Sequence, residues 1–473
     1  MRKTKIICTL GPSSWNEESI EQMLLNGMNV ARLNFSHQTH EIHKQTIDTF
    51  KSVRKKLKIP AALMLDTKGP EIRIGTFKDK CAELNSKNEF ILTARNVPGD
   101  NKKVSITYKE LPKKLSPGNI ILINDGLIQL KVKEIISDDI ICSVEVGGTL
   151  SNRKGINVPG INLDMPFISK SDEEDLLFGI KEDVDFVAAS FVRNGNDVKE
   201  LRNFLDFHGG RKIKIISKIE NIEGVNNFDD ILDRSDGIMI ARGDMGVEIP
   251  FEHLPGLQKL LIDKCVQHGK TVITATQMLE SMIHNNTPTR AEITDIANAV
   301  FDGTSAIMLS GETAIGDHPA LVVSVMSKIA EQAEKDAFEM GTYENIKFNT
   351  DKNDITNAIC DAACTTAKDI GANAIIAVTN SGHTARRVAK FRPKVNIIGT
   401  TPNDKTFHQL SIVWGVCPIQ SIYQEDLHEM YAHAIACAKM HEQVKDGDRV
   451  VITSGTNGTT DLLKVKTITS QKV

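Results

Sequence analysis

The sequence has no long hydrophobic run, no C-x-x-C cysteine pair and few aromatic residues. Because no stretch of about 18 apolar residues is present, no membrane-spanning helix is predicted. The short basic start is not followed by an apolar core with a cleavage site, so no signal peptide is expected. Aromatic residues make up 5% of the chain and the net charge is −4, which argues against a dedicated nucleic-acid-binding protein.

The eight cysteines form no C-x-x-C pair and lie scattered through apolar segments. We interpret them as reduced thiols of a cytoplasmic protein. Charged residues at 25% and apolar residues at 40% are typical of an ordinary soluble protein. With 473 residues, the chain is expected to hold two to four domains of roughly 100–200 residues each.

Eight short apolar runs, each accompanied by a segment of helical period, recur along the chain. Three come before residue 70 and five come after residue 163. The runs are Lys5–Gly11, Asn29–Ser36, Ala61–Gly69, Asp185–Val192, Lys214–Glu220, Gly237–Asp244, Thr271–Gln277 and Ala306–Thr313. Eight strand–helix units are the number that closes a (β/α)8 TIM barrel, and they fit that fold better than the alternative, a doubly wound open sheet.

Two further regions lie outside this series of eight strand–helix units. Residues 70–163 read as short strands separated by turn signals, which predicts an inserted all-β lid domain within a barrel formed by residues 1–69 and 164–339. Residues 340–473 alternate again, with strand-like Ala374–Val378, Val395–Gly399 and Arg449–Ser454. They predict a C-terminal α/β sheet domain of ordinary domain size.

Polar residues stand where the predicted barrel strands end, which is where barrel enzymes carry their working residues. Lys218 and Glu220 lie two positions apart at the end of the fifth run, so both point to one face, and alone they read as an ion pair. The other strand ends carry Thr9, Gly11, Arg32, Asn34, Ser36, Asp66, Thr67, Lys68, Arg242, Asp244, Thr276, Gln277, Ser310 and Glu312. Together they predict a ring of basic groups and carboxylates at one mouth, because unpaired charges at buried positions are costly.

The residue types in this ring indicate phosphoryl-transfer chemistry. Glu220 and Asp244 are hard oxygen ligands of the kind that Mg²⁺ accepts. Lys218 and Arg32 supply positive charge for a phosphate or a carboxylate. A large monovalent cation would suit the neighbouring oxygen donors Asn34, Ser36, Asp66 and Thr67. Phosphoryl transfer needs this combination of metal, cations and positioning.

Six motifs, in order along the chain, resemble those of the pyruvate kinase family. They are ARLNFSH from Ala31, LDTKGPEIR from Leu65, IISKIENIEGV from Ile215, ARGDMGVE from Ala241, TATQMLESM from Thr274 and IMLSGETA from Ile307. The resemblance implies transfer of phosphate from phosphoenolpyruvate to ADP, giving pyruvate and ATP in the last step of glycolysis. It further implies Mg²⁺ (or Mn²⁺) and K⁺ as cofactors and a homotetramer as the assembly.

The resemblance also implies a role for each motif residue. Glu220 and Asp244 would hold the divalent ion, and Lys218 would stabilise the phosphoryl group in transit. Substrate would bind to Arg32, Gly243, Asp244 and Thr276, nucleotide to Arg73, Lys154 and Asn157, and K⁺ to Asn34, Ser36, Asp66 and Thr67. Family members with Glu at the position of Glu71 are typically K⁺-dependent, so K⁺ dependence is expected here.

The loop Thr379-Asn380-Ser381-Gly382-His383-Thr384 follows a predicted strand and opens a predicted helix. It resembles the family's effector loop for phosphorylated metabolites, and an ordinary helix N-cap is the alternative. The glycine-rich stretch from Ser454 to Thr460 could close over such an effector. Two other functions stay open at this point: a Mg²⁺-dependent barrel lyase or aldolase acting on pyruvate, and a phosphometabolite sensor without catalysis.

Overall fold

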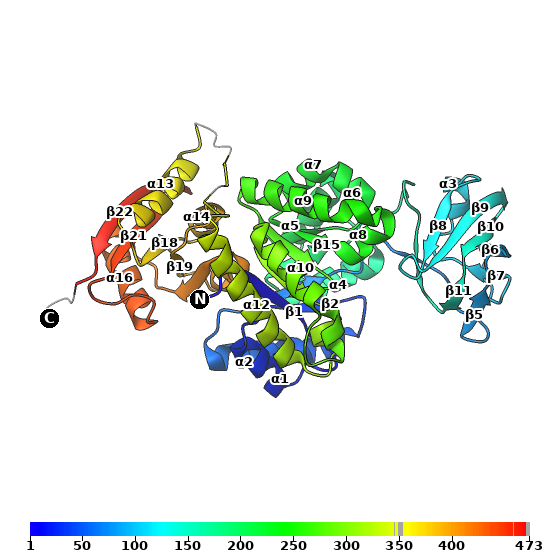
Figure 1. The fold of residues 1–473 in the computed structure, drawn as a ribbon, viewed down its shortest axis with the longest axis horizontal. Helices are drawn as coiled ribbons and strands as arrows, with labels where there is room; N and C mark the ends of the chain where they lie inside the picture. Colours follow the sequence, from blue (N-terminus) through cyan, green and yellow to red (C-terminus); the bar gives the residue numbers. More distant parts are fainter. Residues whose placement is uncertain (162, 345, 349–352, 457, 470–473) are drawn as a thin grey trace.

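The computed structural model describes residues 1–161, 163–344, 346–348, 353–456 and 458–469. Three sheet-based parts follow one another along its long axis, with the barrel in the middle, the inserted β-rich part at one end and the C-terminal sheet at the other (Figure 1). None of the described helices is long and apolar enough to cross a membrane. The eight cysteines are all free thiols.

Eight parallel strands close into a barrel in the order β1-β17-β16-β15-β14-β13-β3-β2. They are β1 (Lys5–Thr9), β2 (Val30–Asn34), β3 (Ala62–Asp66), β13 (Phe186–Ala189), β14 (Lys214–Ile219), β15 (Gly237–Ala241), β16 (Thr271–Ala275) and β17 (Ala306–Leu309). Almost every strand residue is buried, because helices cover the outside and side chains fill the interior. The predicted barrel is confirmed, and the open-sheet alternative was wrong.

The helices around the barrel bury an apolar stripe against the strands. In α2, for example, the side chains of Ile47, Phe50 and Val53 are buried. Helix α10 begins with a capping box formed by Thr289 and Glu292. The elements are α1 (Glu17–Leu25), α2 (His40–Leu57), α4 (Lys170–Lys181), α5 (Gly195–Phe207), α6 (Ile222–Asn226), α7 (Phe228–Arg234), α8 (Arg242–Glu248), η1 (Phe251–His253), α9 (Leu254–His268), η2 (Glu280–Ile283), α10 (Arg290–Phe301), α11 (Gly311–Ala314) and α12 (Pro319–Glu339).

All eight barrel strands are shorter than their sequence runs, and in two of them the end of the run lies in a helix. β15 ends at Ala241, whose pairing with Ala275 is the last in that ladder, so Arg242 and Asp244 lie in helix α8 and not on the strand. Likewise β17 ends at Leu309, and Glu312 lies in α11. The expected strand-end positions were wrong here because the chain turns into a helix as soon as its neighbouring strand stops pairing.

The inserted part has a seven-stranded sheet, β4-β12-β8-β9-β10-β6-β7, and a two-stranded sheet, β11-β5, around its own apolar core. Alternating buried and exposed residues in β9 and β10 are typical of a sheet that exposes one face to solvent. The elements are β4 (Ile72–Arg73), β5 (Cys81–Leu84), β6 (Glu89–Thr93), β7 (Lys103–Ser105), α3 (Leu111–Lys114), β8 (Ile120–Ile123), β9 (Ile128–Ile136), β10 (Asp139–Val146), β11 (Gly148–Ser151) and β12 (Gly155–Asn157).

The C-terminal part is a five-stranded sheet, β20-β19-β18-β21-β22, in which only the edge strand β22 runs antiparallel to its neighbour. Strands β20 and β22 were not expected, and the stretch from Ser454 to Thr460 is the tip of the β21–β22 hairpin, residue 457 lying outside the described residues. The elements are α13 (Ile355–Asp369), β18 (Ala374–Val378), α14 (His383–Lys390), β19 (Asn396–Thr401), α15 (Asp404–Gln409), η3 (Leu410–Ile412), β20 (Val416–Gln420), α16 (Leu427–Met440), β21 (Arg449–Thr456) and β22 (Thr459–Thr467).

Lysine side chains fasten the C-terminal part to the barrel end where the strands begin. Lys405 in α15 donates to the carbonyl oxygens of Asp183 and Val184 at 2.8 and 2.7 Å. Lys5 in β1 donates to the carbonyl oxygen of Val416 at 2.7 Å. The lid and the ring of polar residues lie at the opposite end of the barrel, where the strands finish.

Candidate active site

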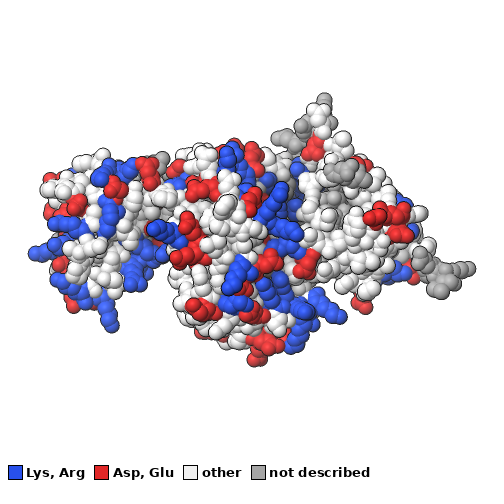
Figure 2. All heavy atoms as spheres, turned by 180° about the vertical axis from the view of Figure 1, so that it is seen from behind, with Lys and Arg blue, Asp and Glu red and all other residues white. Residues whose placement is uncertain are grey.

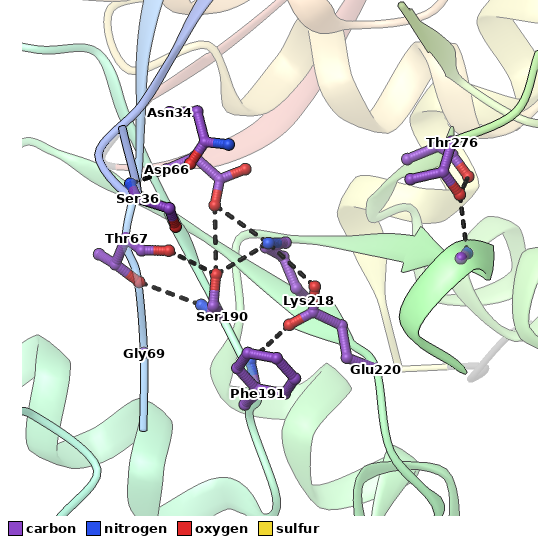
Figure 3. Close-up of polar contacts among 12 residues, drawn as sticks. Asn34, Ser36, Asp66, Thr67, Gly69, Ser190, Phe191, Lys218, Glu220 and Thr276 are labelled. Atoms are coloured by element: carbon purple, nitrogen blue, oxygen red, sulfur yellow. Dashed lines mark hydrogen bonds and ion pairs between the residues drawn. The ribbon is translucent and has the colours of Figure 1, made fainter. Parts of the chain in front are cut away.

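Lys218 lies at the carboxyl end of β14 and makes three polar contacts (Figure 3). Its Nζ lies 2.9 Å from Oε1 of Glu220, 3.0 Å from Oδ1 of Asp66 and 2.8 Å from Oγ of Ser190. Burial alone would lower the pKa of Lys218, but the Asp66 and Glu220 carboxylates outweigh it and raise that pKa. The Lys218 ammonium group is therefore permanently charged at neutral pH.

The carboxylate of Asp66, at the end of β3, contacts two basic side chains. Its Oδ2 accepts from Nε of Arg32 at 2.6 Å, while Oδ1 faces Lys218. Burial opposes ionisation, yet Arg32 and Lys218 together hold the pKa of Asp66 below its ordinary value. Arg32 also donates from Nη1 to Oγ1 of Thr9 at 2.7 Å, so its guanidinium is oriented by both neighbouring strands.

Ser190 and the backbone of Phe191 belong to this cluster and were missed in the sequence. Ser190 Oγ donates to the Thr67 carbonyl oxygen at 2.6 Å and accepts from Lys218. The backbone N–H of Phe191, a residue with φ of 54°, donates to Oε2 of Glu220 at 2.6 Å. The signal was available, because Ser190 is the polar residue that directly follows the fourth barrel strand.

Glu220 and Asp244 form the pair of carboxylates next to Lys218. Burial, together with the Asp244 carboxylate, raises the pKa of Glu220 against the opposing effect of Lys218. The described residues contain no group of three or more His, Cys, Asp or Glu side chains that could enclose a metal. Two oxygen ligands whose mutual repulsion a cation would relieve fit Mg²⁺, which takes one or two carboxylates and completes its shell with water and substrate oxygens.

Thr276 follows β16 in a strained conformation on the far side of the mouth from Lys218 (Figure 3). Its φ is 73° and that of Gln277 is 55°, values that are rare for residues with side chains and cluster at functional sites. Thr276 Oγ1 accepts from the backbone N–H of Gly243 at 2.8 Å, and Arg242 Nη2 donates to the Thr276 carbonyl oxygen at 2.6 Å. The structure thus brings Thr276 and the start of α8 together, as the sequence predicted.

The four candidate K⁺ ligands lie together at the ends of β2 and β3 (Figure 3). Asn34 pairs with Asp66 in the register of these strands, and Asn34 Oδ1 accepts from the backbone N–H of Ser36 at 3.1 Å. Thr67 follows Asp66 and accepts from the backbone N–H of Ser190 through Oγ1 at 3.1 Å. This group of neutral oxygens, with the Asp66 carboxylate among them, fits a weakly hydrated monovalent cation.

The candidate nucleotide residues Arg73, Lys154 and Asn157 all lie on the lid strands or the turn beside them. Arg73 forms an ion pair with Glu71 at 2.7 Å and donates from Nη1 to the Arg153 carbonyl oxygen at 2.8 Å. Lys154 accepts through its carbonyl oxygen from the backbone N–H of Ile74 at 2.9 Å. These residues meet because β12 pairs with β4, Gly155 opposite Arg73.

A cavity of about 420 Å³ lies between the lid and the barrel. Glu71 and Asn157 line it from the lid, and Asp244 and Glu248 line it from α8. The Asn157 side chain lies close enough to the Glu248 carboxylate to oppose the rise in its pKa that burial causes, so the lid approaches the same short helix that carries Asp244. Its volume suits a nucleotide-sized ligand, and it adjoins one of the two candidate metal ligands.

The predicted effector loop lines a second cavity, of about 530 Å³, in the C-terminal part. The loop joins β18 to α14, and Gly382 at the helix start has a φ of 79° that suits glycine. Thr384 Oγ1 lies 2.9 Å from Oγ1 of Thr460, so the β21–β22 hairpin borders the same cavity. The loop and hairpin are thus brought together around a space of ligand size.

Comparisons with known proteins agree with this geometry. Residues 1–323 match the family model described as pyruvate kinase, barrel domain, and residues 357–466 match pyruvate kinase, alpha/beta domain. The chain belongs to the pyruvate kinase family. A pyruvate kinase from Clostridium acetobutylicum is 46% identical over 99% of this chain and the whole of that protein. One from Staphylococcus aureus strain MRSA252 is 46% identical over 98% of this chain and 80% of that protein.

The three-dimensional comparison reaches the same family. A crystal structure of a pyruvate kinase from Cryptosporidium parvum superposes with a TM-score of 0.91 at 40% identity, covering 98% of this chain and 96% of that one. The chain is therefore a phosphotransferase, and the family reaction converts phosphoenolpyruvate and ADP into pyruvate and ATP. The lyase or aldolase alternative and the sensor alternative find no support in these matches.

Proposed function

We propose that Lys218 is the electrostatic clamp of phosphoryl transfer in this member of the pyruvate kinase family. Its charge is secured by Asp66 and Glu220, and it lies at the mouth of the barrel beside the candidate metal ligands. A fixed, buried ammonium group stabilises the negative charge that the moving phosphoryl group carries, without any reorganisation during the step. This contact pattern is the observation on which the proposal rests.

Glu220 and Asp244 would hold the divalent cation, Mg²⁺ or Mn²⁺. When bound, that cation would neutralise charge on the phosphate oxygens. The Phe191 N–H keeps the Glu220 carboxylate directed toward the mouth. Asn34, Ser36, Asp66 and Thr67 would hold K⁺, and the shared residue Asp66 would link that ion to Lys218 and Arg32.

The substrate carboxylate would bind to the start of α8 and to Thr276. The N–H of Gly243 already points at an oxygen, Thr276 Oγ1, and the first-turn amides of a helix favour an anion. Arg32, oriented by Asp66 and Thr9, would complement the negative charge of the substrate. The Thr276 hydroxyl is held at this position because it donates to the Ala275 carbonyl oxygen at 2.6 Å and accepts from the Gly243 N–H.

The lid would bring Arg73, Lys154 and Asn157 onto ADP. The 420 Å³ cavity between lid and barrel supports this role, because a closed lid over it would exclude water from a step that hydrolysis could waste. The residue ranges 70–163 for the lid, 1–69 and 164–339 for the barrel, and 340–473 for an effector and oligomerisation domain remain our proposed domain boundaries.

Regulation by a phosphorylated metabolite would act through Thr379, Asn380, Ser381, Gly382, His383 and Thr384. The 530 Å³ cavity that these residues border supports this site. A cytoplasmic homotetramer, the assembly implied by the family, is likewise part of the proposal. Rates that stay flat in fructose 1,6-bisphosphate, ribose 5-phosphate and AMP would count against such regulation.

A coupled assay for pyruvate tests the function directly. Pyruvate and ATP should form in equal amounts from phosphoenolpyruvate and ADP, and only when Mg²⁺ or Mn²⁺ is present. Pyruvate release that does not need ADP, or turnover in the presence of a chelator, would contradict the proposal.

A further inference from the structure

Two chain connections join the lid to the barrel, and the segment that follows β13 contacts both of them. The lid forms a lobe of its own, on the left in Figure 2. The chain enters the lid between β3 and β4 and leaves it between β12 and α4. Residues 190–193 lie against the entering connection and bond to the leaving one. The place of the lid relative to the barrel mouth therefore depends on this segment.

The entering connection packs closely on the segment at Gly69. Its φ is 72°, and a Cβ atom at Gly69 would come within 2.9 Å of Ser190 Cβ and 3.1 Å of Phe191 Cδ2. The Gly69 N–H donates to Oδ1 of the buried Asp172, in α4, at 3.1 Å. Close packing and one buried carboxylate thus hold the entering connection in place.

The leaving connection is held by the guanidinium of Arg193. Its Nη1 donates to the carbonyl oxygens of Leu163 and Met165 at 3.1 and 3.0 Å. Both carbonyl groups belong to the stretch between β12 and α4, where the chain returns from the lid to the barrel. A single nitrogen atom of Arg193 therefore bonds this stretch to the barrel.

Asp197, in α5, fixes the orientation of that guanidinium. Nε and Nη2 of Arg193 donate to Oδ2 and Oδ1 of Asp197, each at 3.0 Å, and the Arg193 backbone N–H donates to Oδ2 at 2.9 Å. The two side chains are 18% and 7% exposed, so solvent weakens this ion pair little. Two parallel charge-assisted hydrogen bonds fix the plane of a guanidinium, and a lysine at this position would not reproduce them.

The same segment also contacts the candidate catalytic groups at the mouth. Ser190 accepts from Lys218, and the Phe191 N–H donates to Glu220. Arg193 itself lines the cavity of about 420 Å³ between the lid and the barrel. One short segment therefore places the lid connections relative to the Lys218–Glu220 pair.

We propose that Arg193, held by Asp197, is a positioning residue that sets the place of the lid over the nucleotide. This inference rests on the proposed role of the lid in binding ADP. Arg193 acts through the backbone of the leaving connection and not by contact with a phosphate, because its Nε, Nη1 and Nη2 all donate to protein acceptors. Without these contacts the connection would be free to shift, and the lid residues proposed to bind ADP would move with it.

Steady-state kinetics of the full chain test the proposal, with ADP and phosphoenolpyruvate varied separately. Arg193→Met should raise the KM for ADP by about tenfold, because the lid is no longer held over the nucleotide. The KM for phosphoenolpyruvate should stay close to that of the parent, since the residues proposed to bind it belong to the barrel. This separation of the two KM values is not expected from a general loss of stability.

Arg202→Met is the matched control. Arg202 forms the same kind of ion pair, with Asp206 at 2.8 Å, and donates to two carbonyl oxygens at 2.8 and 3.0 Å. These carbonyl groups belong to Ile213 and Gly210, before the start of β14 and away from the lid connections. Both KM values of Arg202→Met should therefore stay close to those of the parent.

Asp197→Asn guards against a folding defect in Arg193→Met, because it leaves Arg193 in place and removes only the charge that orients it. It should also raise the KM for ADP selectively. Hydrogen exchange of peptides that contain Leu163 and Met165 should slow when ADP binds to the parent, and less so in both variants.

Parent-like KM values for ADP in both variants, or an equal rise of both KM values, would overturn the role of Arg193. A parent-like KM for ADP in Arg193→Lys would overturn it too, since charge alone would then suffice. These outcomes leave the proposed function intact. A parent enzyme that forms no pyruvate from phosphoenolpyruvate and ADP would instead overturn the proposed function, and with it this inference.

Discussion

Ser190 links Lys218 to the candidate K⁺ site. Its Oγ accepts from Lys218 Nζ at 2.8 Å and donates to the carbonyl oxygen of Thr67 at 2.6 Å. Because one hydroxyl contacts both groups, a cation bound at the ends of β2 and β3 would influence the position of the ammonium group. Ser190 is a positioning residue in this account.

Ser190→Ala should lower kcat by about 10- to 100-fold, because a hydrogen bond to a charged group contributes roughly 1.5–3 kcal/mol. The K⁺ concentration for half-maximal activation should rise as well, which a purely structural defect would not cause. Ser217→Ala is the matched control, since Ser217 is buried in β14 next to Lys218 and its hydroxyl bonds, among the described residues, to Ser235 Oγ alone at 2.6 Å. Parent-like K⁺ activation in Ser190→Ala would contradict the link.

Potassium should be required for full activity. Replacing K⁺ by Na⁺ at constant ionic strength should lower kcat by about tenfold or more, because Na⁺ is smaller and more strongly hydrated than the large monovalent cation that this oxygen group suits. Glu71→Lys should shrink that difference, as the family pattern at this position implies. Equal rates of the parent enzyme in the two buffers would rule out K⁺ dependence.

Asn157→Ala should weaken nucleotide binding selectively. It removes the lid side chain that lies beside the Glu248 carboxylate at the cavity, so the KM for ADP should rise by about tenfold while the KM for phosphoenolpyruvate stays unchanged. Asn101→Ala, an exposed residue of the same lid, is the control. A parallel rise of both KM values would point to a general defect of the barrel mouth instead.

Lys5 predicts a pH dependence of stability. Burial lowers its folded-state pKa to about 8, below the ordinary value of 10.5, so the cost of its buried charge is fully present below pH 8 and is relieved as the pH rises toward 10.5. Lys5→Met should therefore stabilise the chain more at pH 7 than at pH 10, by a difference on the order of 2 kcal/mol. The comparison of unfolding midpoints at the two pH values measures it.

The direction of this change is what decides the interpretation. A gain from Lys5→Met that is the same at both pH values would mean that Lys5 does not titrate in this window. A gain that grows with pH would mean that the Lys5 charge is stabilising, through its contact with the Val416 carbonyl oxygen, and not costly.

The barrel was predictable because its signal is periodic and local. Helices such as His40–Leu57 and Leu254–His268 agree with the structure to the residue, since an apolar stripe and an end signal mark each one. Lys218 and Glu220 were placed together correctly because their spacing on a strand fixes their common face. The edge strands β20 and β22 were missed because short half-buried edge strands carry little periodic signal.

What could not be predicted depends on contacts between distant segments. Ser190 follows β13 and meets Thr67 only because β13 and β3 are neighbours in the closed barrel. The turn of Arg242 and Asp244 into α8 depends on where the ladder with β16 stops.

The most direct test of the central claim is single-turnover phosphoryl transfer by Lys218→Met at saturating Mg²⁺ and K⁺. Lys214→Met is the matched control, because Lys214 begins the same strand and pairs with Asp236 at 2.9 Å, away from the mouth. The account predicts a loss of about 10²- to 10³-fold or more in the rate for Lys218→Met and a rate close to the parent for Lys214→Met. Undiminished transfer in Lys218→Met would contradict it.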